Sequence, residues 1–395
     1  MRKKLKDVCM FYSGTGFPIQ YQGQTKGEYP FYKVGDIANN AIAGKIYLEL
    51  CNNYISSDVA KMIKGCILPK DTVVFAKIGE ALKLNRRAIT SCDCLIDNNA
   101  MGIAPKLDSL RIQYFYFCMK NLKMQTLAES TTVPSVRKTV LEKYEIEVPS
   151  LVEQEEIEKK LTLTQKIIEK RRQELSYLDE IIKARFVEMF GNPVTNEKGW
   201  NQKQLGEITT KLGSGATPKG GKEAYQEDGI TLIRSMNVHN GLFEYKELAH
   251  ISEEQATKLD NVTIEENDVL LNITGASVAR SCVVPSKILP ARVNQHVCII
   301  RCNQRIVPEF LNKLLIDDNY QRLLWSIARG GATREAITKQ QVESLKIIVP
   351  PIELQNQFAD FVHQVDKSKF DTMTFAPIYA IINLYLHTYF YQGRR

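Results

Sequence analysis

The chain contains one short segment twice, as Glu145-Ile-Glu-Val-Pro-Ser-Leu-Val-Glu-Gln154 and again as Lys346-Ile-Ile-Val-Pro-Pro-Ile-Glu-Leu-Gln355. The two versions align at an offset of 201 residues, with the Val-Pro pair and the final Gln in register. Each version closes a region of β-forming residues and leads into a helical pattern. A repeat spaced this widely predicts two copies of a whole domain.

The alignment extends backwards from this segment through the rest of each copy. Thr132 meets Thr333 and Lys138 meets Lys339 at the same offset, and the copies begin similarly, with Leu5-Lys-Asp-Val8 and Leu205-Gly-Glu-Ile208. Because matches occur in the same order over the full length of each copy, the sequence indicates a tandem duplication.

Each copy follows the same plan of short strands and a helix. β-branched runs predict strands at Thr72–Ala76, Asp268–Ile273 and Val297–Ile300. Helical patterns with aromatic residues follow at Tyr114–Thr126 and Pro308–Ala328. After a loop, each copy ends in the Val-Pro strand and a further helix, so the predicted class is α+β.

The helix after the first copy is the longest predicted element. No Pro or Gly interrupts Ile157–Met189, apolar residues recur there in steps of three and four, and Gly191-Asn-Pro193 ends the pattern. Glu153–Phe190 would span roughly 57 Å as a helix. The second copy starts a similar stripe at Leu354, so we expect the two helices to pack antiparallel as a coiled coil.

These patterns predict five segments. They are a first domain at 1–150, a spacer helix at 151–191, a second domain at 192–351, a shortened second helix at 352–370 and an atypical tail at 371–395.

Composition narrows the functional class only slightly. Residues 1–150 contain 21 Lys+Arg and 14 Asp+Glu, so the whole net charge of +7 falls in the first copy, which weakly favours nucleic acid. Nine scattered cysteines without a Cys-x-x-Cys pattern indicate free thiols and a cytoplasmic location. The pairs Cys92/Cys94 and Cys298/Cys302 could bind a metal, although such cysteines more often pack in the core as small apolar residues. No apolar run is long enough for a membrane span.

Motifs for catalysis are missing from the sequence. Gly213-Ser-Gly215 is an isolated Gly-x-Gly, and Gly221 stands where a phosphate loop that began at Gly215 would need its Lys. No Asn-Pro-Pro-Tyr occurs, as a base methyltransferase would require, and no Pro-Asp pair could begin a nuclease motif. The five histidines have no metal-ligand spacing.

Several segments together resemble the target-recognition domains of Type I restriction–modification specificity subunits. They are Thr217-Pro218, the expected strand Ile230–Asn237, Arg292-Val-Asn-Gln-His-Val297, Gly330-Gly-Ala-Thr-Arg-Glu-Ala-Ile337, and the Val-Pro-Pro segment followed by its helix. Phe186-Val-Glu-Met-Phe-Gly191 is similar to the end of that family's central spacer. The resemblance covers about residues 1–370 and is weaker in the first copy.

This resemblance implies a non-catalytic DNA specificity subunit. Two tandem recognition domains would each read one half of a split double-stranded DNA target. The paired helices would set the spacing of the halves and dock two methyltransferase subunits, and motor and nuclease subunits would join them. S-adenosylmethionine, ATP and Mg would be bound by those partners, and this chain would bind no cofactor or metal.

Lys and Arg are expected on phosphates, and polar side chains on base edges. The candidates in the first copy are Lys33, Lys77, Lys83, Arg86, Arg87, Arg137 and Lys138. Those in the second copy are Arg234, Asn237, Arg280, Arg292, Gln295, Arg329, Arg334 and Lys339.

Two other functional interpretations stay open from the sequence. The chain could be a stand-alone DNA-binding scaffold or regulator without methyltransferase partners, or an unrecognised nuclease or methyltransferase. One segment departs from the resemblance: after Phe370 the apolar stripe is lost, Pro377 follows, and an aromatic run has no counterpart in the first copy. We interpret this tail as a frameshifted or recombined end of the reading frame, which the DNA sequence beyond the stop codon would test.

Overall fold

The computed structural model describes the whole chain except residues 50, 130–132, 218–220, 331–334 and 374–395. The described residues form two compact units, unit 1 (1–173) and unit 2 (174–373). The boundary lies within the longest helix, α7 (Leu151–Phe190), which therefore contributes to both units. Each unit combines small sheets with packed helices, which confirms the predicted α+β class.

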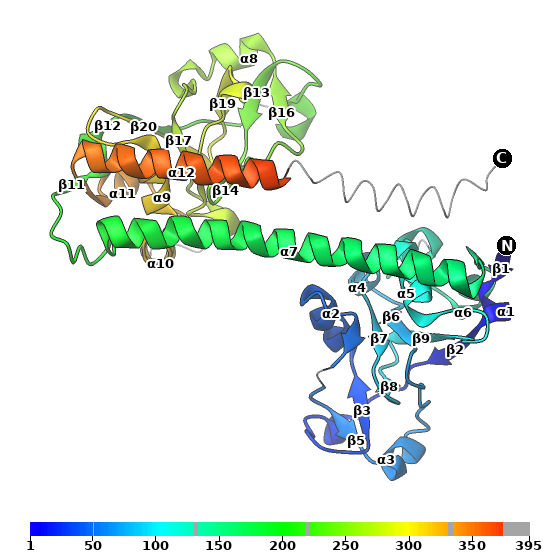
Figure 1. The fold of residues 1–395 in the computed structure, drawn as a ribbon. Coiled ribbons are helices and arrows are strands. Elements are labelled where there is room, and N and C mark those ends of the chain that lie inside the picture. Colours follow the sequence, from blue (N-terminus) through cyan, green and yellow to red (C-terminus); the bar gives the residue numbers. More distant parts are fainter. Residues whose placement is uncertain (50, 130–132, 218–220, 331–334, 374–395) are drawn as a thin grey trace. The chain divides into compact units, whose positions relative to one another are not determined.

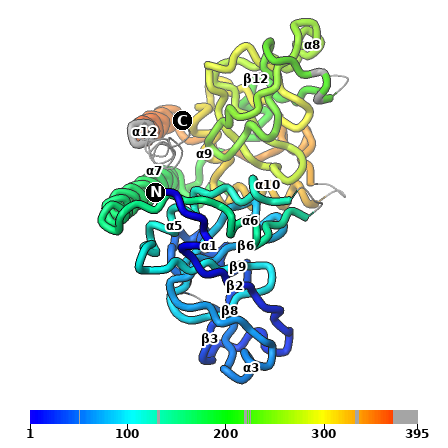
Figure 2. The backbone as a smooth tube through the Cα atoms, turned by 90° about the vertical axis from the view of Figure 1, so that its right-hand side faces the viewer, coloured from blue at the N-terminus to red at the C-terminus, as the bar shows by residue number. Residues whose placement is uncertain are grey.

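Unit 1 is built around a five-stranded sheet with the order β2-β9-β6-β7-β4. Its strands are Cys9–Ser13 (β2), Ala100–Pro105 (β9), Val73–Ala76 (β6), Arg87–Thr90 (β7) and Tyr47–Leu48 (β4). All four residues of β6 are buried. Helices α2 (Val34–Ile42) and α5 (Ile112–Asn121) pack against this sheet, and α5 lies between the strands and α7 (Figures 1 and 2).

A second sheet in unit 1 has the order β5-β3-β8, formed by Tyr54–Ile55, Tyr29–Tyr32 and Leu95–Ile96. Unit 2 repeats this division. Its larger sheet has the order β12-β20-β17-β18, formed by Thr209–Ser214, Val297–Cys302, Val269–Asn272 and Ser281–Val283. Its smaller sheet has the order β16-β13-β19, formed by Ala249–Ile251, Ile230–Ile233 and Ala291–Val293.

The two units share the pairing that joins their ends. In unit 1, β1 (Arg2–Lys4) pairs antiparallel with β10 (Glu145–Glu147). In unit 2, β11 (Gln202–Gln204) pairs antiparallel with β21 (Lys346–Ile348). The beginning and end of each sequence copy therefore meet in a two-stranded ribbon, as expected for a duplicated domain.

The repeated Gln has the same structural role in both units. The side-chain Oε1 of Gln154 accepts a hydrogen bond from the backbone N–H of Arg111 (2.8 Å), and its Nε2 donates to Pro149 O (2.9 Å). Gln355 accepts from the N–H of Val307 (2.9 Å) and donates to Pro350 O (2.8 Å). Both side chains are fully buried, so the amide satisfies backbone groups that water cannot reach.

Helix α7 ends where its sequence predicts. Gly191 follows in the left-handed conformation (φ +73°), which glycine adopts without steric cost. The carbonyl of Phe190 accepts a hydrogen bond from Trp200 Nε1 (2.9 Å), and that of Met189 accepts one from Lys198 Nζ (3.2 Å). These contacts satisfy carbonyls that a helix end leaves without partners.

Helix α12 (Ile352–Met373) packs against the second half of α7 (Figure 1). The ring of Phe358 lies 5.5 Å from the rings of both Phe186 and Phe190, and Lys369 pairs with Asp179 at 2.6 Å. Later residues of α12 thus meet earlier residues of α7, which confirms the predicted antiparallel pair. The atypical tail lies outside the described residues beyond Met373.

Two helical patterns are more broken than the sequence predicted. The first becomes α5 and a 3₁₀ turn at Met124–Leu127, and the second divides into α9 (Pro308–Leu315) and α10 (Asp318–Arg329). The division occurs because the Asp317 carboxylate accepts hydrogen bonds from the N–H groups of Asn319 and Tyr320, which starts a new helix. Among the described helices, none is long and apolar enough to cross a membrane.

Candidate nucleic-acid interface

Both units carry the same loop at the end of an inner strand of the larger sheet. In unit 1, β6 leads into Gly79 (φ +75°), and in unit 2, β17 leads into Gly275 (φ +73°). The N–H of Gly79 donates to Pro134 O and that of Gly275 donates to Glu335 O, both at 2.8 Å. Glycine is required there because a side chain disfavours positive φ.

These loops hold a second segment that comes from late in each copy. The N–H of Val136 donates to Lys77 O (2.9 Å), and the N–H of Ile337 donates to Ile273 O (2.8 Å). The segment preceding each anchor, 130–132 or 331–334, is outside the described residues. The structure therefore brings together two parts of each copy that are far apart in sequence.

In unit 2 this loop borders an open cavity of about 440 Å³, which we call the Gly275 groove. Its lining consists of Ser235, Met236, Thr274, Gly275, Ala276, Ser277, Arg280 and His296. None of these eight residues is acidic. Hydroxyl, imidazole and guanidinium groups there can bind the acceptor atoms of phosphates and base edges.

Polar contacts order the walls of the Gly275 groove. Thr274 Oγ1 lies 2.5 Å from His296 Nδ1, and Arg280 Nη1 lies 3.5 Å from His239 Nδ1. Gly275, Ala276 and Ser277 form a short 3₁₀ turn of small residues. Small side chains let a ligand backbone approach closely, so the groove suits a large polar partner such as DNA.

Several predicted residues of unit 2 lie in or near this groove. Arg280 lines it, and Gln295 is exposed directly before His296 and hydrogen bonds with the Thr217 hydroxyl. Arg329 is exposed, pairs with Glu335 at 3.2 Å and stands 5.0 Å from the Trp325 ring.

Other predicted residues of unit 2 are engaged elsewhere. Lys339 is exposed and pairs with Glu343 at 3.5 Å. Arg234 is half-buried, lies 5.4 Å from the Tyr225 ring and donates a hydrogen bond to Glu247 O. Arg334 lies outside the described residues.

Two predictions in unit 2 need correction because the side chains are buried. Asn237 is fully buried, and its Nδ2 donates to Glu244 O at 3.0 Å. Arg292 is 9% exposed and pairs with Asp260 at 2.7 Å. Both residues hold loops together inside the unit, so we withdraw them as DNA contacts.

In unit 1, the matching loop lies beside the segment that contains Arg137. Val136, the residue before Arg137, donates its backbone N–H to Lys77 O. Lys77 is half-buried, and Arg137 is exposed and pairs with Glu129 at 2.9 Å. Lys138 is also exposed, pairs with Glu142 at 3.7 Å and lies 5.9 Å from the Phe11 ring.

The remaining predicted residues of unit 1 are spread over other elements. Lys33 is half-buried and donates to Gln22 Oε1 at 2.5 Å, while Lys83 is exposed and pairs with Glu80 at 2.6 Å. Arg86 is half-buried and lines a separate cavity. Arg87 is 2% exposed and donates to Leu122 O at 2.8 Å, so it too is withdrawn as a DNA contact.

Sequence reasoning missed Thr274, Ser277 and His296. His296 was visible within Arg292-Val-Asn-Gln-His-Val297, but the sequence favoured a surface or core role for each histidine. All nine cysteines are free, and burial raises the pKa of the Cys94 thiol. The described residues contain no group of three or more His, Cys, Asp or Glu side chains placed to hold a metal.

The repeated units, the helix pair and the absence of acidic residues in the Gly275 groove fit a DNA-reading protein. The Type I restriction modification DNA specificity domain matches residues 1–177 and 197–378. The chain belongs to this family and is the DNA specificity subunit of a Type I restriction–modification system. Specificity subunits are non-catalytic, and family membership is consistent with a chain that binds no cofactor itself.

Individual relatives agree with this assignment over most of the chain. The Type I restriction enzyme MjaIX specificity subunit of Methanocaldococcus jannaschii is 24% identical over 385 residues, which covers 91% of this chain and 85% of that protein. The MjaVIII specificity subunit of the same organism is 23% identical over 383 residues and covers 92% and 85%.

Solved structures show the same fold at low sequence identity. The S subunit of a Type I restriction–modification system from M. genitalium has a TM-score of 0.55 at 14% identity, with 99% of this chain and 96% of that chain covered. A chain from a study of complex assembly and conformational transition in the Type I system has a TM-score of 0.54 at 15% identity, with 98% and 97% covered.

Proposed function

We propose that each unit reads one half of a bipartite double-stranded DNA target. The observation that carries this proposal is the loop at Gly79 and at Gly275, which is built from the same hydrogen bonds in both units. In unit 2 the reading surface is the Gly275 groove with Arg280, Gln295 and Arg329 around it. In unit 1 it is the region of Lys77, Arg137 and Lys138, with Lys33, Lys83 and Arg86 as further phosphate contacts.

The α7–α12 pair sets the distance between the two half-sites. A continuous helix of 40 residues extends for roughly 60 Å. Successive exposures of the major groove on one face of DNA are ~34–36 Å apart, within this length. In this proposal the residue ranges 1–150 and 192–351 are the recognition domains, and 151–191 with 352–370 form the spacer.

The same helix docks the catalytic partners. Leu163 (61% exposed), Tyr177 (59%) and Ile181 (46%) present apolar surface along α7, which favours a protein interface. We assign this surface to two methyltransferase subunits, with motor and nuclease subunits joining the assembly. S-adenosylmethionine, ATP and Mg are bound by these partners, which act in the cytoplasm. Co-purification with the cognate methyltransferase should give two such subunits per chain.

Selection from a random duplex DNA library tests half-site reading. The probe is the full chain with its cognate methyltransferase, as wild type, Arg280→Ala and Lys77→Ala. Arg280→Ala should relax the sequence preference in one half of the target only, and Lys77→Ala should weaken or relax the other half. Relaxation of both halves by one variant, or of neither half by both, would contradict the proposal.

A further inference from the structure

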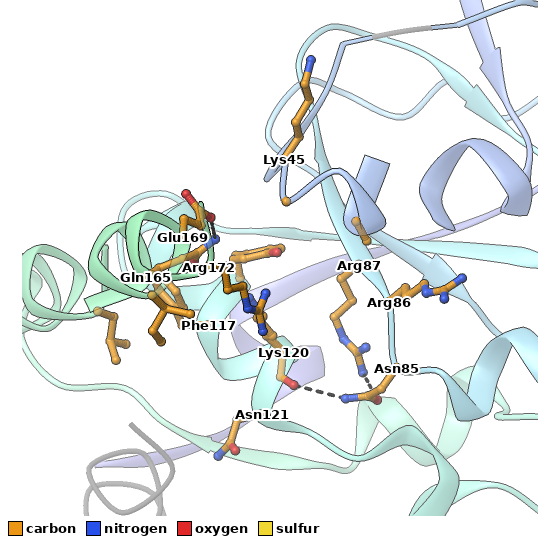
Figure 3. A pocket seen from close by; sticks show the side chains of 15 residues that line it. Lys45, Asn85, Arg86, Arg87, Phe117, Lys120, Asn121, Gln165, Glu169 and Arg172 are labelled. Carbon is orange, nitrogen blue, oxygen red and sulfur yellow. Dashed lines mark hydrogen bonds between the residues drawn. The ribbon is translucent and has the colours of Figure 1, made fainter. Parts of the chain in front are cut away.

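Unit 1 contains a cavity of about 370 Å³, and Figure 3 shows the side chains that line it. The lining includes no residue of the loop at Gly79. It lies between α5, the first part of α7, the turn after α2 and the start of β7. Its apolar wall includes Tyr116, Phe117, Leu161 and Ile168. Cavities of this volume and mixed lining are within the range that binds small organic molecules.

The charged groups around this cavity are mostly basic. Lys45, Arg86, Arg87, Lys120 and Arg172 line it, and Glu169 is the only carboxylate among its described lining residues. Lys45 also pairs with Glu49 outside the cavity at 2.5 Å. Arg87 and Lys120 alone already outnumber the one carboxylate, Glu169, so the cavity attracts an anion.

Arg87 makes this charge unusual because it is buried without a carboxylate. Its Nη2 donates to Asn85 Oδ1 at 2.8 Å (Figure 3). The same atom donates to Leu122 O, also at 2.8 Å. Its Nε and Nη1 are buried and have no hydrogen-bond partner among the described residues. Burial lowers the pKa of Arg87 to about 10. A buried guanidinium that lacks a counter-charge is unfavourable, so an anion in the adjoining cavity would stabilise it.

Gln165, another residue that lines the cavity, also has a buried polar atom without a hydrogen-bond partner among the described residues. Gln165 donates from Nε2 to Glu169 Oε1 at 3.0 Å, but its Oε1 has no partner among the described residues. Lys120 on α5 also lines the cavity, with its ammonium 5.8 Å from the Tyr116 ring. The cavity thus combines cations, an available amide and an apolar wall.

The equivalent position in unit 2 lacks these features. Strands β6 and β17 are equivalent in the two units. Arg87 pairs with Phe75 of β6 and Ser281 pairs with Leu271 of β17, so unit 2 has Ser281 where unit 1 has Arg87. The repeated Gln residues bind the N–H groups of Arg111 and Val307, which are therefore equivalent positions. At the same distance along the chain from these two residues, Lys120 of α5 corresponds to Ile316 after α9. The cavity beside Ile316 is lined by four Asp and three Lys residues. Among the described residues, the position in unit 2 that is equivalent to the basic cavity is therefore not predominantly basic.

We propose that this unit 1 cavity binds a small phosphomonoester that carries a planar ring, of the nucleoside monophosphate type. The phosphate lies near Lys120, where it also balances the charge of Arg87. The ring lies against the apolar wall formed by α5 and α7. Because the ligand contacts α5, β7 and α7 together, it stabilises the attachment of the first part of α7 to unit 1.

Calorimetric titration of the full chain with adenosine 5′-monophosphate tests this site. Adenosine and inorganic phosphate serve as half-probes and should bind more weakly than the whole molecule. Lys120→Gln and Arg87→Gln should each weaken binding roughly tenfold. The first removes a charge-assisted hydrogen bond, and the second removes the buried charge that the anion balances. Lys123→Gln is the matched control, since Lys123 is exposed and does not line the cavity. Circular dichroism identifies any variant that fails to fold. If Arg87→Gln fails to fold, Lys120→Gln alone tests the proposal.

Each variant is also tested in the other binding assay, which distinguishes the mononucleotide site from the DNA-reading surface. Arg280→Ala should leave binding of the mononucleotide unchanged, and Lys120→Gln should leave affinity for duplex DNA unchanged. Absence of mononucleotide binding at millimolar concentration would overturn the proposal. Wild-type affinity in Lys120→Gln, or equal loss of mononucleotide and DNA binding in that variant, would also overturn it.

Discussion

Units 1 and 2 share their backbone connections but use α7 differently. In unit 1, Ile157 and Leu161 from the first part of α7 enter the core. In unit 2, α12 supplies Phe358 in the corresponding way, and the second part of α7 adds a further helix through residues such as Phe186 and Phe190. The core of unit 2 therefore depends on two helices that are separated by the whole domain in sequence.

This difference shows what the duplication kept and what it left free to change. The buried Gln and the Gly loop have fixed backbone partners, so alternatives there would leave buried groups without hydrogen bonds. Side chains that face the cavities have no such constraint. Arg87 can therefore stand where unit 2 has Ser281, and the two units can present different surfaces from one scaffold.

The largest expected effect is on the stability of unit 2, because only this unit has the second part of α7 in its core. Phe190→Ala should lower the free energy of unfolding of unit 2 by about 4 kcal/mol, because a fully buried ring is removed from contact with Phe310 and Phe358. The only two tryptophans, Trp200 and Trp325, are in unit 2, so tryptophan fluorescence during urea unfolding reports on this unit.

Two substitutions on α7 serve as controls for that measurement. Tyr177→Ala removes a side chain that is 59% exposed and should change stability by less than about 0.5 kcal/mol. Leu161→Ala should destabilise unit 1 but leave the tryptophan-detected transition in place. If Phe190→Ala leaves that transition unchanged, the second part of α7 is not part of the unit 2 core.

The next effect tests whether the two units depend equally on the repeated Gln. Gln154→Leu and Gln355→Leu should each cost about 3 kcal/mol in their own unit, because a buried N–H and carbonyl lose their partners. Tryptophan fluorescence measures the second variant, and hydrogen exchange at the Arg111 amide measures the first. A large effect in only one unit would break the structural equivalence of the copies.

A smaller effect concerns DNA affinity. Arg280→Ala should weaken binding of the cognate duplex by about 1–3 kcal/mol, since it removes a cation from the Gly275 groove. Fluorescence anisotropy at fixed salt measures the change. Lys287→Ala is the control, because Lys287 is exposed and does not line the groove. Equal losses in both variants would indicate general charge attraction instead of a defined site.

The smallest effect is at an exposed ion pair that only unit 2 contains. Lys183 of α7 pairs with Asp318 of α10 at 3.1 Å, and both side chains are more than half exposed. Lys183→Gln should change the unfolding free energy of unit 2 by less than about 0.5 kcal/mol, because solvent and salt screen such pairs. A loss comparable to that of Phe190→Ala would show that the α7 packing is electrostatic.

Much of the fold could be predicted from the sequence because its signals are local. The absence of Pro and Gly, together with the three- and four-residue apolar steps, predicted α7, and Gly191 predicted its end. The repeated Val-Pro and Gln residues predicted two similar units. The break at Asp317 was missed because a single capping carboxylate competes with an otherwise continuous helical pattern.

The sequence by itself determined the duplication, the long helix and the antiparallel partner that its apolar stripe required. The tertiary structure alone decided which charged and polar residues are available to a ligand. Arg87, Asn237 and Arg292 were reasonable DNA contacts by residue type, but packing buries them. His296 and Thr274 meet in a groove because chain segments more than 20 residues apart converge there. Burial and proximity depend on every neighbour in space, and a linear pattern does not contain that information.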